Sequence, residues 1–228
     1  MDRRQFTHTL TWLVCPGWAL AQPLAGIKPA EASAGIKAAL DQGVQAAVSQ
    51  LGSMDGFLGN PKVRIPLPGF LADASQLLKV TGQGARVDEL VTAMNRAAEA
   101  AVPLGKKLLV GAVKNMTVAD ATAVLTGGDD AVTRFFADKT RAPLSEQFLP
   151  VVRTATAKVG LADRYNRVAG KAAGLGLIKD KEANIERYVT DRTLDGLYAV
   201  IAEQERALRA NPAQAGSAIL KKVFGALQ

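Results

Sequence analysis

The sequence has few of the side chains that enzymes commonly use as nucleophiles or metal ligands. It contains one histidine, one cysteine and two tryptophans, and they are His8, Cys15, Trp12 and Trp18. If the leading segment that carries them is removed, catalysis by a Ser-His or Cys-His pair is excluded. A zinc, copper or haem site held by histidine or cysteine is then excluded as well, and no disulfide can form.

That leading segment has the features of a secretory signal peptide. A basic start at Arg3-Arg4 precedes a mostly apolar run from Leu10 to Leu20, which is too short for a permanent membrane anchor. Ala19-Leu20-Ala21 then provides a small-x-small cleavage site before Gln22. We therefore expect residues 1–21 to be removed between Ala21 and Gln22, and the protein to be periplasmic or secreted. The alternative is an ordinary buried helix at the amino terminus.

Two details of this segment bear on the export route. Arg3-Arg4-Gln5-Phe6 resembles the twin-arginine motif, which directs export after folding. The sequence leaves this route and the general secretory route open. Cys15 would be the attachment site of a lipoprotein, but it follows Val14 where lipid attachment requires a small residue, so we do not expect a lipoprotein.

The chain is basic, with a net charge of +7 from 28 Lys and Arg against 21 Asp and Glu. Removal of Asp2, Arg3 and Arg4 with the signal peptide changes this charge to +6. A basic balance permits contact with anionic lipid, envelope polymers or nucleic acid. The cations are spread along the chain, however, and no aromatic and basic platform of the kind used by single-strand binders is present. We expect no nucleic-acid partner, and peripheral contact with an anionic membrane stays open.

Composition and periodicity predict an all-α protein. Alanine and leucine are abundant, aromatic residues make up 5% of the chain, and long β-branched runs are absent. Apolar residues recur at helical spacing with short breaks, which predicts a single-domain bundle of about eight to ten helices. The expected divisions are a linker over 22–30 and one helical domain over 31–228. No later stretch is long and apolar enough for a transmembrane helix.

One short segment, 61–68, is expected to be extended. It contains three prolines, and a residue that precedes proline is pushed out of the helical region. Val63 and Ile65 lie on the same side of an extended segment, so we expect them to anchor it on the core. The segment is too short to start a sheet.

A corner between two helices is expected after Met116. Thr117 and Asp120 have the spacing of a capping box, with aspartate in place of the usual glutamate. Gly127-Gly128 is expected to take the left-handed conformation that ends a helix. Asp129 or Asp130 is then expected to cap the next helix.

Prolines and an asparagine predict further helix limits. Pro103 fits the first turn of a helix, and Pro143 is expected to begin another that Pro150 would kink. Asn184 is expected to cap a single turn, with a long helix starting near Thr190. The buried side of the helix after Pro103 is expected to contain Leu104, Leu108, Ala112 and Met116.

Several motifs occur in a fixed order along the chain after the leader. They are Asp55-Gly56-Phe57-Leu58, Asn60-Pro61-Lys62-Val63-Arg64-Ile65-Pro66-Leu67-Pro68, Met94-Asn95-Arg96-Ala97-Ala98-Glu99, Leu125-Thr126-Gly127-Gly128-Asp129-Asp130-Ala131, Asp195-Gly196-Leu197-Tyr198, Ile201-Ala202-Glu203, Asn211-Pro212 and Leu220-Lys221-Lys222-Val223-Phe224-Gly225. Together they resemble the bacterial domain-of-unknown-function family 4197. The resemblance implies an exported, envelope-associated helical protein, and it carries over no activity, cofactor or catalytic residue.

Carboxylates are the reactive groups that remain after these exclusions. They can hold a hard cation or act as paired acids across a sugar bond. The densest cluster is Asp129-Asp130, which Glu99 or Asp120 could join as a cation or ligand site. The competing interpretation of the cluster is a helix cap with favourable charge near a helix start.

A candidate polar pocket collects the polar residues of the expected central helices. Its residues are Asn95, Arg96, Glu99, Asp129, Asp130, Asp195 and Glu203. Arg96 and Glu99 are three residues apart and can form an ion pair, so a salt-bridge network that holds two helices together is the alternative. Asp195 lies at neither end of its helix, and we expect it to make a buried polar contact with another helix. Tyr188 and Tyr198 are expected to be core aromatics with their hydroxyls at the surface.

We expect a non-enzymatic, exported envelope protein that uses no cofactor. It would bind a protein partner or a small apolar or amphiphilic ligand. One alternative is a carboxylate-dependent enzyme acting on envelope glycans or phosphoesters, and another is a peripheral binder of anionic membranes. A cavity or groove would favour ligand binding, whereas acids converging in a cleft would favour the enzyme.

Overall fold

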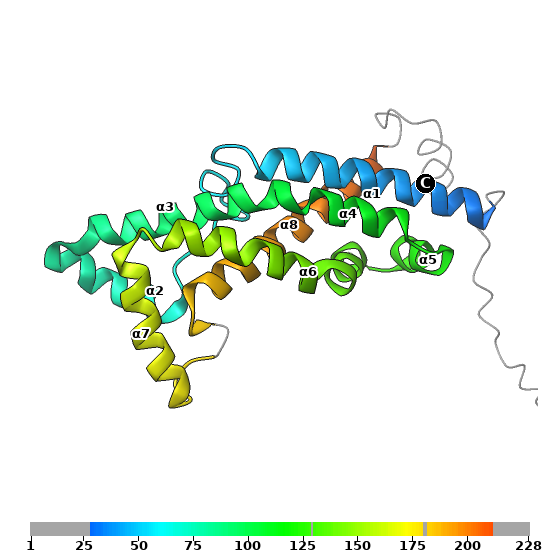
Figure 1. The fold of residues 1–228 in the computed structure, drawn as a ribbon. Coiled ribbons are helices and arrows are strands. Elements are labelled where there is room, and N and C mark those ends of the chain that lie inside the picture. Colours follow the sequence, from blue (N-terminus) through cyan, green and yellow to red (C-terminus); the bar gives the residue numbers. More distant parts are fainter. Residues whose placement is uncertain (1–27, 129, 180–181, 212–228) are drawn as a thin grey trace, which may run out of the picture.

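The computed structural model describes residues 28–128, 130–179 and 182–211, and the described chain is helical with no strand (Figure 1). The elements are α1 (Pro29–Leu51), α2 (Gly69–Leu78), the π-helix η1 (Lys79–Gln83), α3 (Gly84–Ala101), the 3-10 helix η2 (Val102–Gly105), α4 (Lys106–Lys114), α5 (Val118–Thr126), α6 (Ala131–Thr156), α7 (Gly160–Gly174) and α8 (Ile185–Ala210). The all-α prediction is confirmed. The predicted signal peptide with its cleavage site at Ala21 and Gln22, most of the linker, Asp129 and the last part of the helical domain lie outside the described residues.

The described helices form six uninterrupted runs, fewer than the eight to ten expected. The difference arises because α2, η1, α3, η2 and α4 follow one another without a break. Gly82, with φ of 78°, kinks the chain inside η1 without ending the helical run. Pro103 occupies the first turn of η2, where its missing N–H removes no helical hydrogen bond.

Two further predicted limits were also misplaced. Pro143 and Pro150 both lie inside α6, so Pro143 does not begin a separate helix. Asn184 does act as a cap, because its Oδ1 accepts a hydrogen bond from the N–H of Arg187 at 2.9 Å. The turn that it caps is the first turn of α8, which therefore begins five residues before Thr190.

The core lies where the longest helices cross. α6 packs against α8 and α3, and α1 packs against α8, α4 and α5. Phe136 of α6 and Tyr198 of α8 stack with ring centroids 6.3 Å apart. The Tyr198 hydroxyl lies 2.9 Å from Oγ1 of buried Thr140, so it is in the core and not at the surface as expected. α7 has fewer neighbours and projects from the bundle (Figure 1).

The segment predicted to be extended is held on this core, but 61–63 forms a turn, closed by the hydrogen bond from the Arg64 N–H to the Asn60 carbonyl at 2.8 Å, and the extended part is shorter than expected. Residues 64–68 have no helical structure, and both Val63 and Ile65 are buried. Tyr188 fixes the end of the segment, because its hydroxyl donates a hydrogen bond to the Pro66 carbonyl at 3.0 Å. The segment forms no sheet with any described residue.

The corner between α5 and α6 differs from the prediction in one part. The capping box is present, since Thr117 Oγ1 accepts from the Asp120 N–H at 3.0 Å and an Asp120 carboxylate oxygen accepts from the Thr117 N–H at 2.9 Å. Gly127, however, has φ of −75° and is not left-handed. Glycine is needed there because a Cβ would lie 2.5 Å from the Ala123 carbonyl oxygen and 2.6 Å from the Ala131 Cβ.

No single helix among the described residues has the length and apolar composition needed to cross a membrane. One pair of helical stretches, Leu71–Lys114 with Val118–Thr126, passes that test together and is bent by 101° between them.

Candidate functional site

Three predicted pocket residues of α3 hold the loop between α1 and α2. Buried Asn95 accepts a hydrogen bond from the Ile65 N–H at 2.8 Å, and its Nδ2 donates to the Ile65 carbonyl at 3.0 Å. Glu99, also buried, accepts from the N–H groups of Phe57 and Leu58, both at 3.1 Å. These side chains supply the hydrogen bonds that a neighbouring strand would otherwise provide.

Arg96 completes this group by joining Glu99 to the loop. Its Nη1 lies 2.7 Å from Glu99 Oε2, and its Nη2 lies 2.8 Å from Asp55 Oδ1. The hydrogen bonds to Glu99 and then to Asp55 raise the pKa of the Arg96 guanidinium above its ordinary value. Asp55 has φ of 64°, in the left-handed region that non-glycine residues rarely adopt, and the ion pair with Arg96 helps to hold it there.

The other predicted pocket residues lie at three separate places. Glu203 of α8 pairs with Lys62, and therefore also holds this loop. Asp195 of α8 pairs with Arg141 of α6, and its half-exposed side chain makes the interhelical contact without being buried. Asp130 is mostly exposed at the start of α6, where it pairs with Arg134 and makes no capping hydrogen bond with its side chain. Asp129 lies outside the described residues.

A buried polar junction was missed by the sequence analysis. Asn166 of α7 donates to Glu186 Oε2 at 2.9 Å and accepts from the Ile185 N–H at 2.8 Å. The Thr156 hydroxyl of α6 donates a hydrogen bond to Glu186 Oε1 at 3.3 Å. This junction joins α6 and α7 to the start of α8. The sequence did contain one indication of this junction. Glu186 follows the Asn184 cap in the first turn of α8, where a carboxylate is favoured by the helix dipole.

A polar pocket surrounds Asp195. It has a volume of about 330 Å³ and includes Asp191, Arg192 and Tyr188. Arg141 lies 3.7 Å from Asp191 and also pairs with Asp195, so one guanidinium contacts both carboxylates. Among the described residues, no group of three or more His, Cys, Asp or Glu side chains is placed to hold a metal ion.

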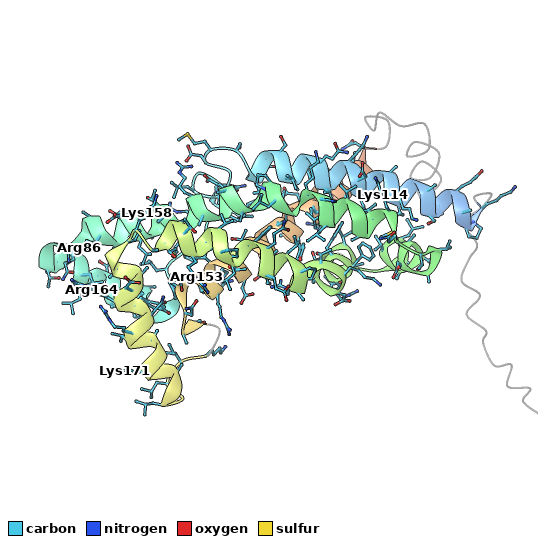
Figure 2. All side chains as sticks on the ribbon, in the orientation of Figure 1. Arg86, Lys114, Arg153, Lys158, Arg164 and Lys171 are labelled. Carbon is cyan, nitrogen blue, oxygen red and sulfur yellow. The ribbon has the colours of Figure 1, made fainter. Side chains whose placement is uncertain are left out.

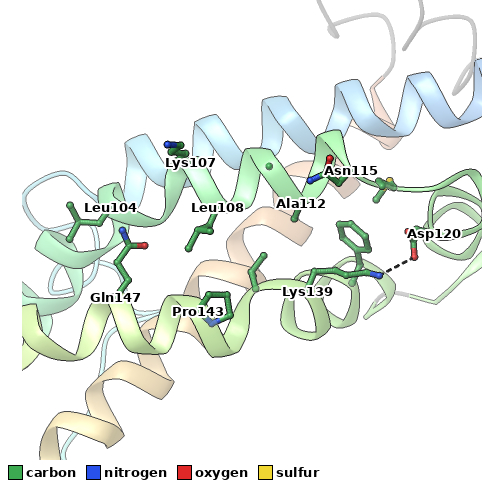
Figure 3. A pocket seen from close by; sticks show the side chains of 13 residues that line it. Leu104, Lys107, Leu108, Ala112, Asn115, Asp120, Lys139, Pro143 and Gln147 are labelled. Atoms are coloured by element: carbon green, nitrogen blue, oxygen red, sulfur yellow. Dashed lines mark ion pairs between the residues drawn. The ribbon is translucent and has the colours of Figure 1, made fainter.

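An open groove lies between α4 and α6, and we call it the α4–α6 groove (Figure 3). Its volume is about 680 Å³. The residues that line it are Leu104, Lys107, Leu108, Gly111, Ala112, Asn115, Met116, Asp120, Phe135, Lys139, Thr140, Pro143 and Gln147. Most are apolar or small, and Leu104 and Leu108 remain 45% and 37% exposed. The groove thus presents apolar surface that no described part of the chain covers.

Two lysines contribute positive charge to this groove. Lys107 comes from α4 and Lys139 from α6. Lys139 is 3.8 Å from Asp120, which also belongs to the capping box of α5 (Figure 3). The hydrogen bonds from the Thr117 N–H and hydroxyl, with a smaller contribution from Lys139, lower the pKa of Asp120. Lys107 forms no ion pair within the described ranges, so its charge is available to a ligand.

The sequence contained a partial signal for this groove. Leu104, Leu108, Ala112 and Met116 were expected on the buried side of the helix after Pro103. The structure buries Met116 together with Leu109 and Val113, and leaves Leu104 and Leu108 partly exposed. η2 and α4 together therefore have a wider apolar surface than their packing against α1 and α6 covers.

The comparisons with known proteins concern the whole fold and not one site. A family model described as a protein of unknown function, DUF4197, matches residues 26–225. Comparison with curated proteins and with solved structures found no similar protein. Since the match covers most of the chain, as the ordered motifs implied, the chain belongs to the DUF4197 family of proteins of unknown function.

Proposed function

We propose that the protein is a non-enzymatic binding protein that takes an acidic amphiphile, such as a fatty acid, in the α4–α6 groove. The acyl chain would lie along Leu104, Leu108 and Pro143, and the acidic head would lie near Lys107 and Lys139. The observation that carries the proposal is the open apolar groove with a lysine contributed from each of its two walls.

Size and energy are consistent with such a ligand. Small-molecule sites commonly have volumes of about 300–1,000 Å³, and this groove has about 680 Å³. Each buried methylene contributes about 0.8 kcal/mol, so ten would contribute about 8 kcal/mol before the cost of association. That cost is at least about 4 kcal/mol, and one ion pair with lysine offsets part of it. Because the groove is open on one side, we expect dissociation constants in the micromolar range or weaker.

The carboxylate-enzyme alternative has less support. Glu99 binds loop N–H groups and Arg96, while Asp130 pairs with Arg134 at the surface. Asp191 and Asp195 share a pocket, but Arg141 contacts both of them. A pair of catalytic acids needs one member that donates a proton and another that acts as base or nucleophile, whereas these two carboxylates share one arginine partner, which gives no basis for assigning them different roles.

Gly111 allows the groove to be filled without damage to the helix. An added Cβ at Gly111 would meet nothing within 4 Å, and the residue lies inside α4. Gly111→Leu should therefore retain the fold, and it replaces a poor helix former with a good one. Gly170→Leu is the matched control, because Gly170 is also a helical glycine with open space around it but lies in α7, outside the groove.

The test is titration with a fluorescent dodecanoic-acid analogue below its critical micelle concentration. We expect saturable binding by the parent chain and by Gly170→Leu, and at least a tenfold loss of affinity for Gly111→Leu. Lys139→Gln should weaken binding of dodecanoate more than binding of dodecanol, since only the acid carries a charge. Absence of saturable binding, or equal binding by Gly111→Leu, would refute the proposal.

A further inference from the structure

The outer side of α7 carries a stripe of cations and aliphatic side chains. Exposed Arg164, Val168, Lys171 and Leu175 are separated by four, three and four residues, so they lie along one side of the helix. Exposed Arg167 lies beside them. We call these five residues, together with Leu177, the α7 stripe. Figure 2 shows Arg164 and Lys171 on the outer side of the projecting helix.

The opposite side of α7 packs against the rest of the described structure and holds the helix there. Ala162, Tyr165 and Ala169 are buried, and the Tyr165 hydroxyl donates a hydrogen bond to the Glu182 carbonyl. Asn166 joins Glu186 at the polar junction described above. The α7 stripe is therefore not needed to hold the helix in place.

The end of α7 exposes two leucines. Gly176, with φ of 72°, lets the Leu177 N–H donate to the Ala172 carbonyl at 2.9 Å and the Gly176 N–H donate to the Ala173 carbonyl at 2.8 Å. This is the Schellman pattern, in which the residue at the position of Leu177 frequently packs back onto the helix. Here Leu175 is 75% exposed and Leu177 is 73% exposed. A helix end closed by two backbone hydrogen bonds thus leaves two apolar side chains in solvent.

The cations of the stripe are not neutralised by the described protein. Arg164, Arg167 and Lys171 form no ion pair with any described residue. The nearest acids along the chain and across the adjoining pocket are Asp163 of α7 and Glu89 of α3, and neither is within ion-pair distance of them. Arg86, Arg153 and Lys158 add further positive charge near the same end of the molecule (Figure 2).

We infer that the α7 stripe is a docking surface for an anionic lipid bilayer. Arg164, Arg167 and Lys171 contact the lipid headgroups, and Leu175 and Leu177 enter the boundary between headgroups and acyl chains. Cations beside exposed aliphatic residues are typical of helices that lie on anionic membranes. A nucleic-acid surface would instead use exposed aromatic rings for base stacking, and Tyr165, the aromatic residue of α7, is buried. The inference does not depend on the α4–α6 groove.

Vesicle co-sedimentation tests this inference. The protein is used as purified from cells, and the parent and all variants have the same amino terminus. The vesicles contain either phosphatidylcholine alone or phosphatidylcholine with 30% phosphatidylglycerol, a composition chosen for the test. Each basic residue near an anionic surface strengthens partitioning roughly fivefold. We therefore expect R164Q/R167Q/K171Q to weaken binding to the anionic vesicles on the order of a hundredfold. Binding by the parent should also fall as salt increases.

Two control sets separate a specific surface from general charge. K28Q/K106Q/K114Q removes the same charge from exposed positions elsewhere, and its affinity should fall by less than fivefold. L175S/L177S should weaken binding to anionic vesicles at least fivefold, whereas L77S/V80S, which alters exposed apolar residues of α2 and η1, should not. Circular dichroism should show unchanged helix content for every variant, because all the altered side chains are exposed.

Three results would overturn the inference. Equal loss of binding for both charge triples would show that net charge alone governs association. Unchanged vesicle binding by L175S/L177S, together with equally strong binding to heparin beads, would identify a general polyanion surface and not a membrane surface. Equal binding to neutral and anionic vesicles at every salt concentration would exclude electrostatic docking.

Discussion

Replacing Asn95 by alanine tests how an extended segment is stabilised in a protein whose described part contains no strand. The Asn95 amide forms one hydrogen bond to the Ile65 N–H, at 2.8 Å, and another to the Ile65 carbonyl, at 3.0 Å. Alanine leaves both backbone groups buried without these partners. Each unsatisfied group costs about 1–3 kcal/mol, so the expected loss of unfolding free energy is about 2–6 kcal/mol. Typical total stabilities are about 5–15 kcal/mol.

The assay is urea denaturation followed by circular dichroism, with hydrogen exchange at the Ile65 amide as a local measurement. Asn95→Asp should also destabilise, because it retains the acceptor for the Ile65 N–H but loses the donor to the Ile65 carbonyl. Asn115→Ala is the matched control: Asn115 is exposed and its side chain has no hydrogen-bond partner among the described residues, so the change should stay within about 0.5 kcal/mol. A loss below about 1 kcal/mol for Asn95→Ala would refute the reasoning.

Three other positions give predictions of defined sign. Gly127→Ala should destabilise by about 1–3 kcal/mol because the new methyl group would overlap the Ala123 carbonyl oxygen. Gly170→Ala should instead stabilise the protein by up to about 1 kcal/mol, since the added Cβ enters open space beside α7. Differential scanning calorimetry should show that the melting temperature falls for Gly127→Ala and rises for Gly170→Ala. Equal shifts of the two melting temperatures would contradict the close approach at Gly127. Burial, with a smaller effect of Glu182, raises the pKa of Tyr165 from 10.0 to about 12, so the unfolded chain releases this proton first. The stabilising contribution of neutral Tyr165 is complete below pH 10 and is lost as the pH rises from 10 through 12. Tyr165→Phe removes this titration, so its unfolding free energy, measured by urea denaturation, should fall less over this pH range than that of the parent. An unchanged pH dependence would contradict the shifted pKa of Tyr165.

Local chemistry predicted those features of the fold that depend on neighbours in sequence. The Thr117–Asp120 capping box and the Asn184 cap depend on residues three apart, and both are present. The prolines of 61–68 likewise excluded a helix there. The error at Pro143 has the opposite origin, because surrounding helices can stabilise a continuous helix through a residue that was expected to begin a new one. Local signals therefore identify caps more reliably than they show whether a helix continues through a proline.

The candidate polar residues illustrate a second limit. Asn95, Arg96 and Glu99 do act together, but their partners are backbone groups of Phe57, Leu58 and Ile65 and the side chain of Asp55, all about 30–40 positions earlier in the chain. A carboxylate placed to accept two N–H groups and a carboxylate placed to bind a ligand have the same sequence signature. Only the tertiary fold shows whether the hydrogen-bonding capacity of such a side chain is already used.

The groove shows how an incorrect prediction of burial can itself point to function. The spacing of Leu104, Leu108, Ala112 and Met116 predicts an apolar face, and that face exists. Packing in the bundle uses the neighbouring positions Leu109 and Val113, so the apolar surface of η2 and α4 is wider than the core requires. An exposed leucine is ordinary by itself, but two in a groove that also contains Phe135, Pro143 and a lysine from each wall form a contiguous surface with a favoured ligand chemistry. For that reason the proposed ligand is an acidic amphiphile, and Gly111→Leu tests the surface without disturbing the core.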